Sequence, residues 1–282
     1  MAAVPLLVTG GRGFLGRQVV RLAAAAGIDV VAPASDELDI RDLSAVQRYL
    51  RSIRPAAIAH LAYRVDERDT IVDGSACVAR LAAELGARLV HLSTDVVFAG
   101  RTEPYTEADP PTPVYAYGAA KADAERVVAE LDPGAVLVRT SLLYAADPHD
   151  PGAPVEAVRR ALQDPASSVF FTDEVRCPAL VDDVAAGVVS LCRDRALAGV
   201  SGPLHLAGTD ALSRFEFAQL IAQWLGSNGA ALRAGTHADF GLVRPDHLIL
   251  DSSRAASLGL RCRGVRAVLS SRPARPARPA RP

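Results

Sequence analysis

The feature that most restricts the fold is a glycine pattern close to the N-terminus. An apolar run from Val4 to Val8 leads into Gly10, Gly13 and Gly16, and an amphipathic segment follows. A strand, a glycine turn and a helix start in this order form a dinucleotide site, because glycines let the backbone approach a pyrophosphate at the helix N-terminus. The spacing is Gly-x-x-Gly-x-x-Gly, not the commoner Gly-x-Gly-x-x-Gly. The pattern predicts a βα unit that binds NAD or NADP.

The first half of the chain alternates apolar runs with helical patterns. This alternation predicts a parallel sheet with helices on both faces, an α/β fold of the Rossmann-type doubly wound class. The runs are apolar almost without interruption, which suits strands that are buried on both faces. We expect strands at 6–9, 29–32, 57–61, 89–93 and 135–139, and helices at 16–26, 43–52, 73–86 and 114–131.

Beyond about residue 145 the pattern becomes mixed, which predicts a smaller α/β substrate-binding cap. Ser213 and Glu216 have capping-box spacing, so a helix is expected to begin there. Further elements are expected at 155–162 (helix), 182–193 (helix) and 202–207 (strand). We divide the chain into an NAD(P)-binding Rossmann part at 1–145, a substrate-binding part at 146–270 that shares strands with it, and a disordered Arg/Pro/Ala tail at 271–282.

Composition excludes several classes of protein. The formal net charge is −1, and removing the tail, whose residues 272–282 hold four arginines and no acid, leaves −5, so we expect no nucleic-acid partner. No apolar run approaches the roughly 18 residues of a membrane span, and no signal peptide is recognisable. The 4 cysteines form no Cys-x-x-Cys pair and the 6 histidines are dispersed. We therefore predict a cytoplasmic protein with reduced thiols and no metal site.

The chain has a single lysine. Of its 31 basic residues, 30 are arginine and one is Lys121. Lys121 follows Tyr117 by four positions, so a helix would place the phenol and the ammonium on one face, one turn apart. A lysine is a compact charge whose proton affinity can be tuned, whereas an arginine is wide, planar and always charged. The ammonium would favour the phenolate and make Tyr117 a better proton donor.

A third polar group is expected at the carboxyl end of a parallel strand, where ligands bind in such sheets. Hydride transfer to a carbonyl needs a proton donor, a cation and a hydrogen-bond donor close to the nicotinamide. Thr94 directly follows the strand expected at 89–93, ahead of Tyr117 in the sequence. Taken alone, Thr94 fits an ordinary turn equally well. Together with Tyr117 and Lys121 it predicts a catalytic site.

These strings resemble the extended short-chain dehydrogenase/reductases, and within that superfamily they are most similar to the dTDP-4-dehydrorhamnose reductase group. The similarity covers residues 4 to about 269. The matching strings are 9–16, 92–100, 117–121 with Glu125, 138–141, Pro178 with 183–185, 244–245 and 258–259. The resemblance implies an NAD(P)H-dependent oxidoreductase that reduces a nucleotide-linked 4-keto-6-deoxy sugar, and it is compatible with a homodimer.

The resemblance also implies roles for individual residues. Tyr117 would protonate the C4 carbonyl oxygen, Thr94 would hydrogen-bond the same oxygen, and Lys121 would lower the pKa of Tyr117 and hold the nicotinamide ribose. Asp39 would meet the adenine, and Arg244 would lie near the substrate's phosphates. The expected substrate contacts are Thr94, Asp95, Val96 and Arg244. The expected cofactor contacts are Gly10, Arg12, Gly13, Phe14, Leu15, Gly16, Ser35, Asp39, Ile40, Leu61, Ala62, Tyr63, Tyr117 and Lys121.

Two other functions stay open on the sequence. One is a sugar-nucleotide epimerase or dehydratase of the same superfamily. Dehydratases typically carry an acidic pair beside the threonine, and here only Asp95 follows Thr94 before Val96, which argues against that chemistry. The other is a non-catalytic nucleotide-binding subunit, since a regulatory subunit of methionine adenosyltransferase shares this architecture. The presence of Thr94, Tyr117 and Lys121 together favours the enzyme.

The expected cofactor is NADP, with NAD as the alternative. An NAD site usually has an acid at the end of the second strand to hold the ribose 2′-hydroxyl, and none stands directly after that strand here. Ser35 could donate a hydrogen bond to a 2′-phosphate, and Arg12 in the glycine turn could pair with it. Asp36 and Glu37 follow at once, and either one turned toward the ribose would suit NAD.

Overall fold

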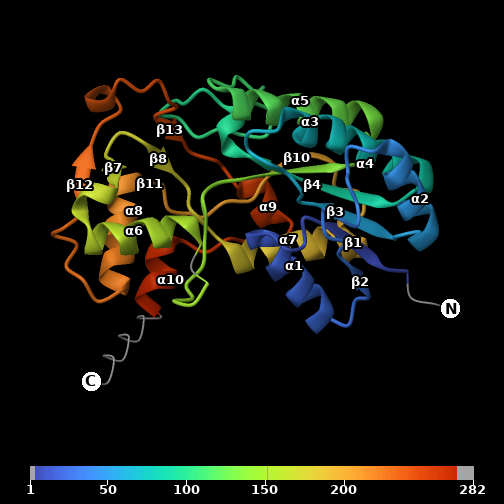
Figure 1. The fold of residues 1–282 in the computed structure, drawn as a ribbon, viewed down its shortest axis with the longest axis horizontal. Coiled ribbons are helices and arrows are strands. Elements are labelled where there is room, and N and C mark those ends of the chain that lie inside the picture. Colours follow the sequence, from blue (N-terminus) through green and yellow to red (C-terminus); the bar gives the residue numbers. More distant parts are fainter. Residues whose placement is uncertain (1–3, 151, 272–282) are drawn as a thin grey trace.

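A computed structural model of the chain describes residues 4–150 and 152–271. The tail predicted as disordered therefore lies, from residue 272 on, outside the described residues. Within them, six strands form a central sheet in the order β10-β5-β4-β3-β1-β2, and every pairing in it is parallel (Figure 1). The strands are β1 (Leu6–Thr9), β2 (Val30–Val31), β3 (Ala57–His60), β4 (Arg88–Thr94), β5 (Val136–Thr140) and β10 (Gly202–His205). The predicted Rossmann-type sheet is confirmed.

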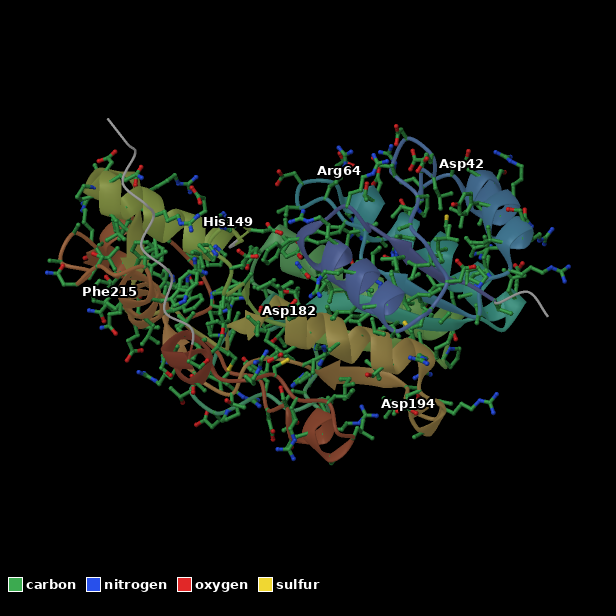
Figure 2. The ribbon with its side chains drawn as sticks, turned by 90° about the horizontal axis from the view of Figure 1, so that it is seen from below. Asp42, Arg64, His149, Asp182, Asp194 and Phe215 are labelled. Carbon is green, nitrogen blue, oxygen red and sulfur yellow. The ribbon has the colours of Figure 1, made fainter. Side chains whose placement is uncertain are left out.

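Helices cover both faces of this sheet (Figure 1). One face packs on α1 (Phe14–Ala25) and α7 (Val181–Arg193), which lie side by side in the foreground of Figure 2, where Asp182 and Asp194 mark the two ends of α7. The other face packs on α2 (Leu43–Ile53), α4 (Asp73–Leu85) and α5 (Ala116–Leu131), with the short α3 (Arg68–Ile71) beside α5. Alternate strand residues enter the two cores, which explains why the strands read as unbroken apolar runs.

Several boundaries differ from the predicted ones for local reasons. β2 is shorter than 29–32, because the chain turns away at Pro33, which has no backbone N–H to continue the ladder. α1 begins at Phe14, with Gly13 in extended conformation before it, and not at residue 16. β4 runs one residue further than expected, so that Thr94 is its last residue and pairs with Thr140 of β5.

The second part of the chain contributes to the central sheet and also forms a separate layer. Its β10 pairs with β5, and its α7 packs on α1. A second core gathers around α6 (Ala153–Gln163), α8 (Arg214–Trp224) and α10 (Val265–Ser271). Ser213 and Glu216 form the predicted capping box of α8. The remaining elements are β6 (Leu143–Tyr144), β7 (Val169–Phe171), β8 (Val175–Arg176), β9 (Ala179–Leu180), β11 (Leu212–Ser213), β12 (Arg233–Gly235), β13 (His247–Leu248) and α9 (Ser253–Ser257).

None of the helices in the described part of the chain has the length and apolar character needed to cross a bilayer. Residues 4–150 and 152–271 contain no group of three or more His, Cys, Asp or Glu side chains arranged to hold a metal ion.

Candidate active site

The turn between β1 and α1 leaves no room for a side chain at Gly10 or Gly16. Gly10 has a φ of +71°, and a Cβ placed on it would lie 2.8 Å from Ala62 N. A Cβ on Gly16 would lie 2.1 Å from Gly10 O. Gly13 N donates to Gly10 O at 2.9 Å, and no side chain caps the start of α1. The first N–H groups of α1 are therefore free to meet a pyrophosphate, and the turn fits a dinucleotide as the sequence predicted.

A cavity of about 770 Å³ extends from this turn across the carboxyl ends of β1, β2 and β3. A second cavity, of about 680 Å³, continues from the turn toward β4, α5 and the second part of the chain. The two adjoin, because both are lined by Gly10, Gly13, Phe14, Leu61 and Tyr63. Every residue expected to contact the cofactor lines at least one of them. We call them the cofactor cavity and the substrate cavity.

The three expected catalytic residues all line the substrate cavity. Thr94 comes from the carboxyl end of β4, whereas Tyr117 and Lys121 come from the first turns of α5. Lys121 is 3% exposed, and its Nζ donates to Leu92 O at 2.9 Å. Its Nζ also lies 4.8 Å from the centroid of the Tyr63 ring, which in turn lies 6.0 Å from the Tyr117 ring. Residues from two separate segments of the sequence, β4 and α5, thus meet on one wall of the substrate cavity.

The electrostatics of this wall differ from expectation in one respect. We expected Lys121 to lower the pKa of Tyr117, but the pKa of Tyr117 is raised, first by burial and then by Tyr63 and Asp95. Burial also lowers the pKa of Lys121 to about 8, while Glu125 acts to raise it. The raised pKa has a simple cause: the phenol of Tyr117 is itself largely buried, which disfavours its charged form, while the ammonium of Lys121 donates to Leu92 O. Tyr117 is thereby kept protonated, as a proton donor must be.

Asp95 does not reach the substrate cavity, although it was expected to contact substrate. It is fully buried behind Thr94. Arg176 holds it through two bonds, from Nε to Oδ2 at 2.7 Å and from Nη2 to Oδ1. Thr94 Oγ1 also donates to Asp95 Oδ1 at 3.2 Å. Asp95 therefore acts on the site through Thr94 and Arg176, both of which line the cavity, as does Val96.

Arg244, the arginine expected near the substrate's phosphates, is exposed and does not line the substrate cavity, but its charge acts to lower the pKa values of Tyr115 and Arg214, which do line it. Arg160 of α6, Arg176 of β8 and Arg214 at the start of α8 are the arginines that line the cavity itself. Among the described lining residues there are four basic side chains, counting Lys121, and no Asp or Glu. Sequence reasoning missed these arginines because a chain with 30 arginines gives no signal for any one of them.

The adenosine end of the cofactor cavity shows which acids are free to meet a ribose. Ser35, Asp36 and Arg12 line it. Glu37 does not, because its Oε2 accepts from Ala34 N at 2.6 Å and so closes the turn after β2. Asp39 lines the cavity but is paired with Arg41, and hydrogen bonds from that guanidinium lower the pKa of Asp39 to about 2.

A buried histidine, His60, ties the cofactor-side strand ends together. Ser75 Oγ donates to Ile71 O, so it accepts from His60 Nε2 at 3.1 Å. The other ring nitrogen, Nδ1, is then the acceptor for Thr9 Oγ1 at 2.7 Å. Burial lowers the pKa of His60 to about 3. A permanently neutral imidazole in this position aligns β1 with β3 directly before the glycine turn, and it supplies no proton.

The profile of the RmlD substrate binding domain family matches residues 4–271. The chain belongs to this family. The fold is shared by the crystal structure of dTDP-4-dehydrorhamnose reductase from Bacillus anthracis str. Ames in complex with NADP, with a TM-score of 0.82. The two chains are 28% identical, and the match covers 94% of this chain and 96% of that one. The resemblance inferred from the motifs is confirmed.

Curated relatives of this RmlD family member include two groups, proteins named as reductases and proteins named as a methionine adenosyltransferase subunit. The chain is 32% identical over 269 residues to "Probable dTDP-4,6-dihydroxy-2-methyloxan-3-one 4-ketoreductase" of Streptomyces antibioticus, covering 90% of the chain and 89% of that protein. It is 30% identical over 277 residues to methionine adenosyltransferase 2 subunit beta of Pongo abelii, covering 90% and 82%. Overall similarity therefore does not separate the two groups, and the geometry of the site must do so.

Proposed function

We propose that this protein is an NADPH-dependent reductase of a nucleotide-linked 4-keto-6-deoxy sugar. The observation that carries the proposal is the grouping of Thr94, Tyr117 and Lys121 on one wall of a cavity that adjoins the glycine turn. A reductase needs this juxtaposition, and a subunit that only binds a nucleotide does not. The comparisons support the proposal through the relatives named as reductases.

The cofactor fits the residues that are present, because the turn at Gly10 and Gly16 is a cradle that any Cβ would fill. NADPH supplies the hydride when it is bound. Tyr117 supplies the proton to the carbonyl oxygen, and Thr94 stabilises the same oxygen once it turns its hydroxyl hydrogen away from Asp95. Lys121, whose Nζ lies over the Tyr63 ring that in turn lies beside Tyr117, would provide the positive charge that favours the developing phenolate.

The far part of the substrate cavity suits the nucleotide diphosphate. Arg160 and Arg214 line it, and neither guanidinium has a hydrogen-bond or ion-pair partner among the described residues. Arg176 lines it too, but is neutralised by Asp95 and Glu174. Two unpaired guanidinium groups match a diphosphate, because such groups bind phosphate oxygens through charge-assisted hydrogen bonds.

Replacing Arg214 with methionine is expected to raise KM for the sugar nucleotide by about 10- to 100-fold, the worth of a hydrogen bond to a charged group, with a small change in kcat. The phosphates do not react, so their binding is equal in the ground and transition states. Steady-state kinetics measure both constants. Arg159→Met is the matched control, because Arg159 lies on α6 next to Arg160 but binds Pro148 O and Glu156. Equal KM values in the two variants would contradict the assignment.

NADPH is expected to be preferred over NADH, because Arg12 and Ser35 line the adenosine end and Glu37 is held by Ala34, which leaves Asp36 as the acid that opposes a 2′-phosphate. The ratio of kcat/KM for the two cofactors should exceed one in the native protein and fall in Arg12→Ala. Arg21→Ala serves as control, since Arg21 lies on the outer side of α1 and bonds Gln18 and Asp182. A ratio below one, or an Arg12→Ala variant with the native ratio, would show that another group selects the cofactor.

The direct test of the proposal is oxidation of NADPH in the presence of nucleotide-linked 4-keto-6-deoxy sugars, followed at 340 nm with product analysis. Formation of the reduced sugar supports the enzyme. Tight NADPH binding without turnover of any such sugar would favour the non-catalytic subunit. The homodimer, the absence of a nucleic-acid partner and the cytoplasmic location stay predictions from the sequence.

A further inference from the structure

A buried carboxylate, Glu125, connects the helix of Tyr117 and Lys121 to the strand of Thr94. Glu125 lies on α5 one turn after Lys121 and is 4% exposed. Its Oε1 accepts from Ser93 Oγ at 2.5 Å, directly before Thr94 in the chain. Both its oxygens accept from Arg139 of β5, with Nη2 to Oε2 at 2.7 Å.

These contacts act together with the bond from Lys121. Two neighbouring residues of β4 are held by two residues one turn apart on α5, because Lys121 Nζ donates to Leu92 O and Glu125 accepts from Ser93. Arg139 is 2% exposed, so this anchor is buried on the β5 side as well. We propose that Glu125 is a positioning residue that fixes Lys121 and Tyr117 against Thr94 and keeps Lys121 charged.

The charge argument rests on the surroundings of Lys121. The charged and titratable groups around it are Glu125 on its own helix, with Arg139 of β5 paired to that carboxylate, and His60 of β3 and His91 of β4, with the Tyr63 ring beside them. Both histidines are fully buried and have lowered pKa values, chiefly through burial, so they stay neutral. Glu125 is therefore the carboxylate that offsets the burial of the ammonium.

The chain permits a direct test, because Lys121 is its single lysine. Protein labelled with carbon-13 at the lysine ε position gives one lysine signal, so no assignment is needed, and its titration reports the charge of Lys121 without reference to any substrate. In Glu125→Gln the midpoint is expected to move to lower pH. Glu130→Gln is the matched control, because Glu130 lies on the same helix and also pairs with an arginine, Arg126, but is exposed. Its midpoint should equal that of the native protein.

A second variant guards against loss of folding, since Glu125→Gln leaves Arg139 as a buried charge without its partner. Glu125→Gln/Arg139→Gln removes both charges and should melt at a higher temperature than the single variant, and its lysine midpoint should lie between those of the single variant and the native protein, because a cation is lost together with the carboxylate. A purely structural anchor would give the opposite pattern: lower melting temperatures with an unchanged lysine midpoint. That result would overturn the proposal.

The kinetic readout rests on the proposed reductase function, and the lysine titration does not. In the reductase assay, kcat should fall as pH rises through the pKa of Lys121, which is about 8 in the native protein, because the ammonium is charged only below it. In Glu125→Gln this fall should begin at lower pH, with kcat at pH 8 reduced roughly fivefold if the carboxylate is worth about one pH unit. If the lysine midpoint moves in Glu125→Gln but the native protein has no reductase activity, the proposed function is refuted and the charge role of Glu125 is supported. A lysine midpoint that does not move in Glu125→Gln would refute the proposed role of Glu125 and leave the reductase function unaffected.

Discussion

Replacing Tyr117 with phenylalanine is expected to lower kcat by about 10²- to 10⁴-fold, the usual contribution of a positioned proton donor. Only the hydroxyl is lost, and the ring keeps its place beside Tyr63. The melting temperature and the affinity for NADPH should therefore change little. Single-turnover rates with a verified sugar nucleotide measure the effect free of product release. A Tyr117→Phe variant with near-native turnover would remove Tyr117 from the reaction.

Lys121→Arg distinguishes a tuned ammonium from a mere positive charge. Lys121 is 3% exposed and its Nζ fits against Leu92 O. A guanidinium is wider, planar and always charged, so it cannot occupy this place without moving β4 or α5. Like Tyr117→Phe, the Lys121→Arg variant should lose activity, although the net charge of the protein is unchanged. Full activity in Lys121→Arg would mean that the single lysine of this chain has no special role.

The fold was predictable because its signals are local. Strand, glycine turn and helix follow each other within 4–26, and burial on both faces makes the strands apolar throughout. Beyond about residue 145, strands such as β8 and β13 are two residues long and pair across large sequence separations. Two residues do not establish a period, so the second layer could only be expected as a mixed pattern.

The part of the site that could be predicted is the part whose residues have a recognisable spacing in the sequence. Tyr117 and Lys121 share a helix, and Thr94 ends a strand, so their convergence followed from the fold class. Asp95 was expected to contact substrate, but it is buried and held by hydrogen bonds from Arg176, which lies 81 residues further along the chain and could not be foreseen as its partner. That Arg160, Arg176 and Arg214 line the cavity could not be predicted, because which arginine lines a cavity depends on the packing of short cap elements. The pKa of Tyr117 was misjudged because burial is a property of the assembled fold.

The match to methionine adenosyltransferase 2 subunit beta sharpens this distinction between fold and function. A fold does not by itself determine function, so the glycine turn and the sheet carry no information on catalysis. The evidence for catalysis in this chain is the buried polar set around Tyr117: Lys121 against Leu92 O, and Glu125 between Ser93 and Arg139. Buried charges are costly unless they are paired. Their presence beside Tyr117 and Thr94 supports the proposed reductase.

The largest structural effect is expected from Gly16→Ala. A Cβ at this position would lie 2.1 Å from Gly10 O and 2.8 Å from Gly11 Cα, and both are backbone atoms that cannot rotate away. The turn must therefore open, which moves the first N–H groups of α1 from the place that suits a pyrophosphate. We expect NADPH binding to weaken by about 100-fold, equivalent to about 3 kcal/mol, and stability to fall by about 1–3 kcal/mol from overpacking.

Gly199→Ala is the control for this substitution, because no atom lies within 4 Å of a Cβ at that position. Titration of NADPH fluorescence and thermal melting of both variants separate a local clash from a general cost of losing a glycine. If the cofactor cradle depends on close backbone approach, only Gly16→Ala loses affinity, and it does so even at temperatures where it is fully folded. A folded Gly16→Ala variant that binds NADPH as tightly as Gly199→Ala would show that the pyrophosphate is held elsewhere than at the start of α1.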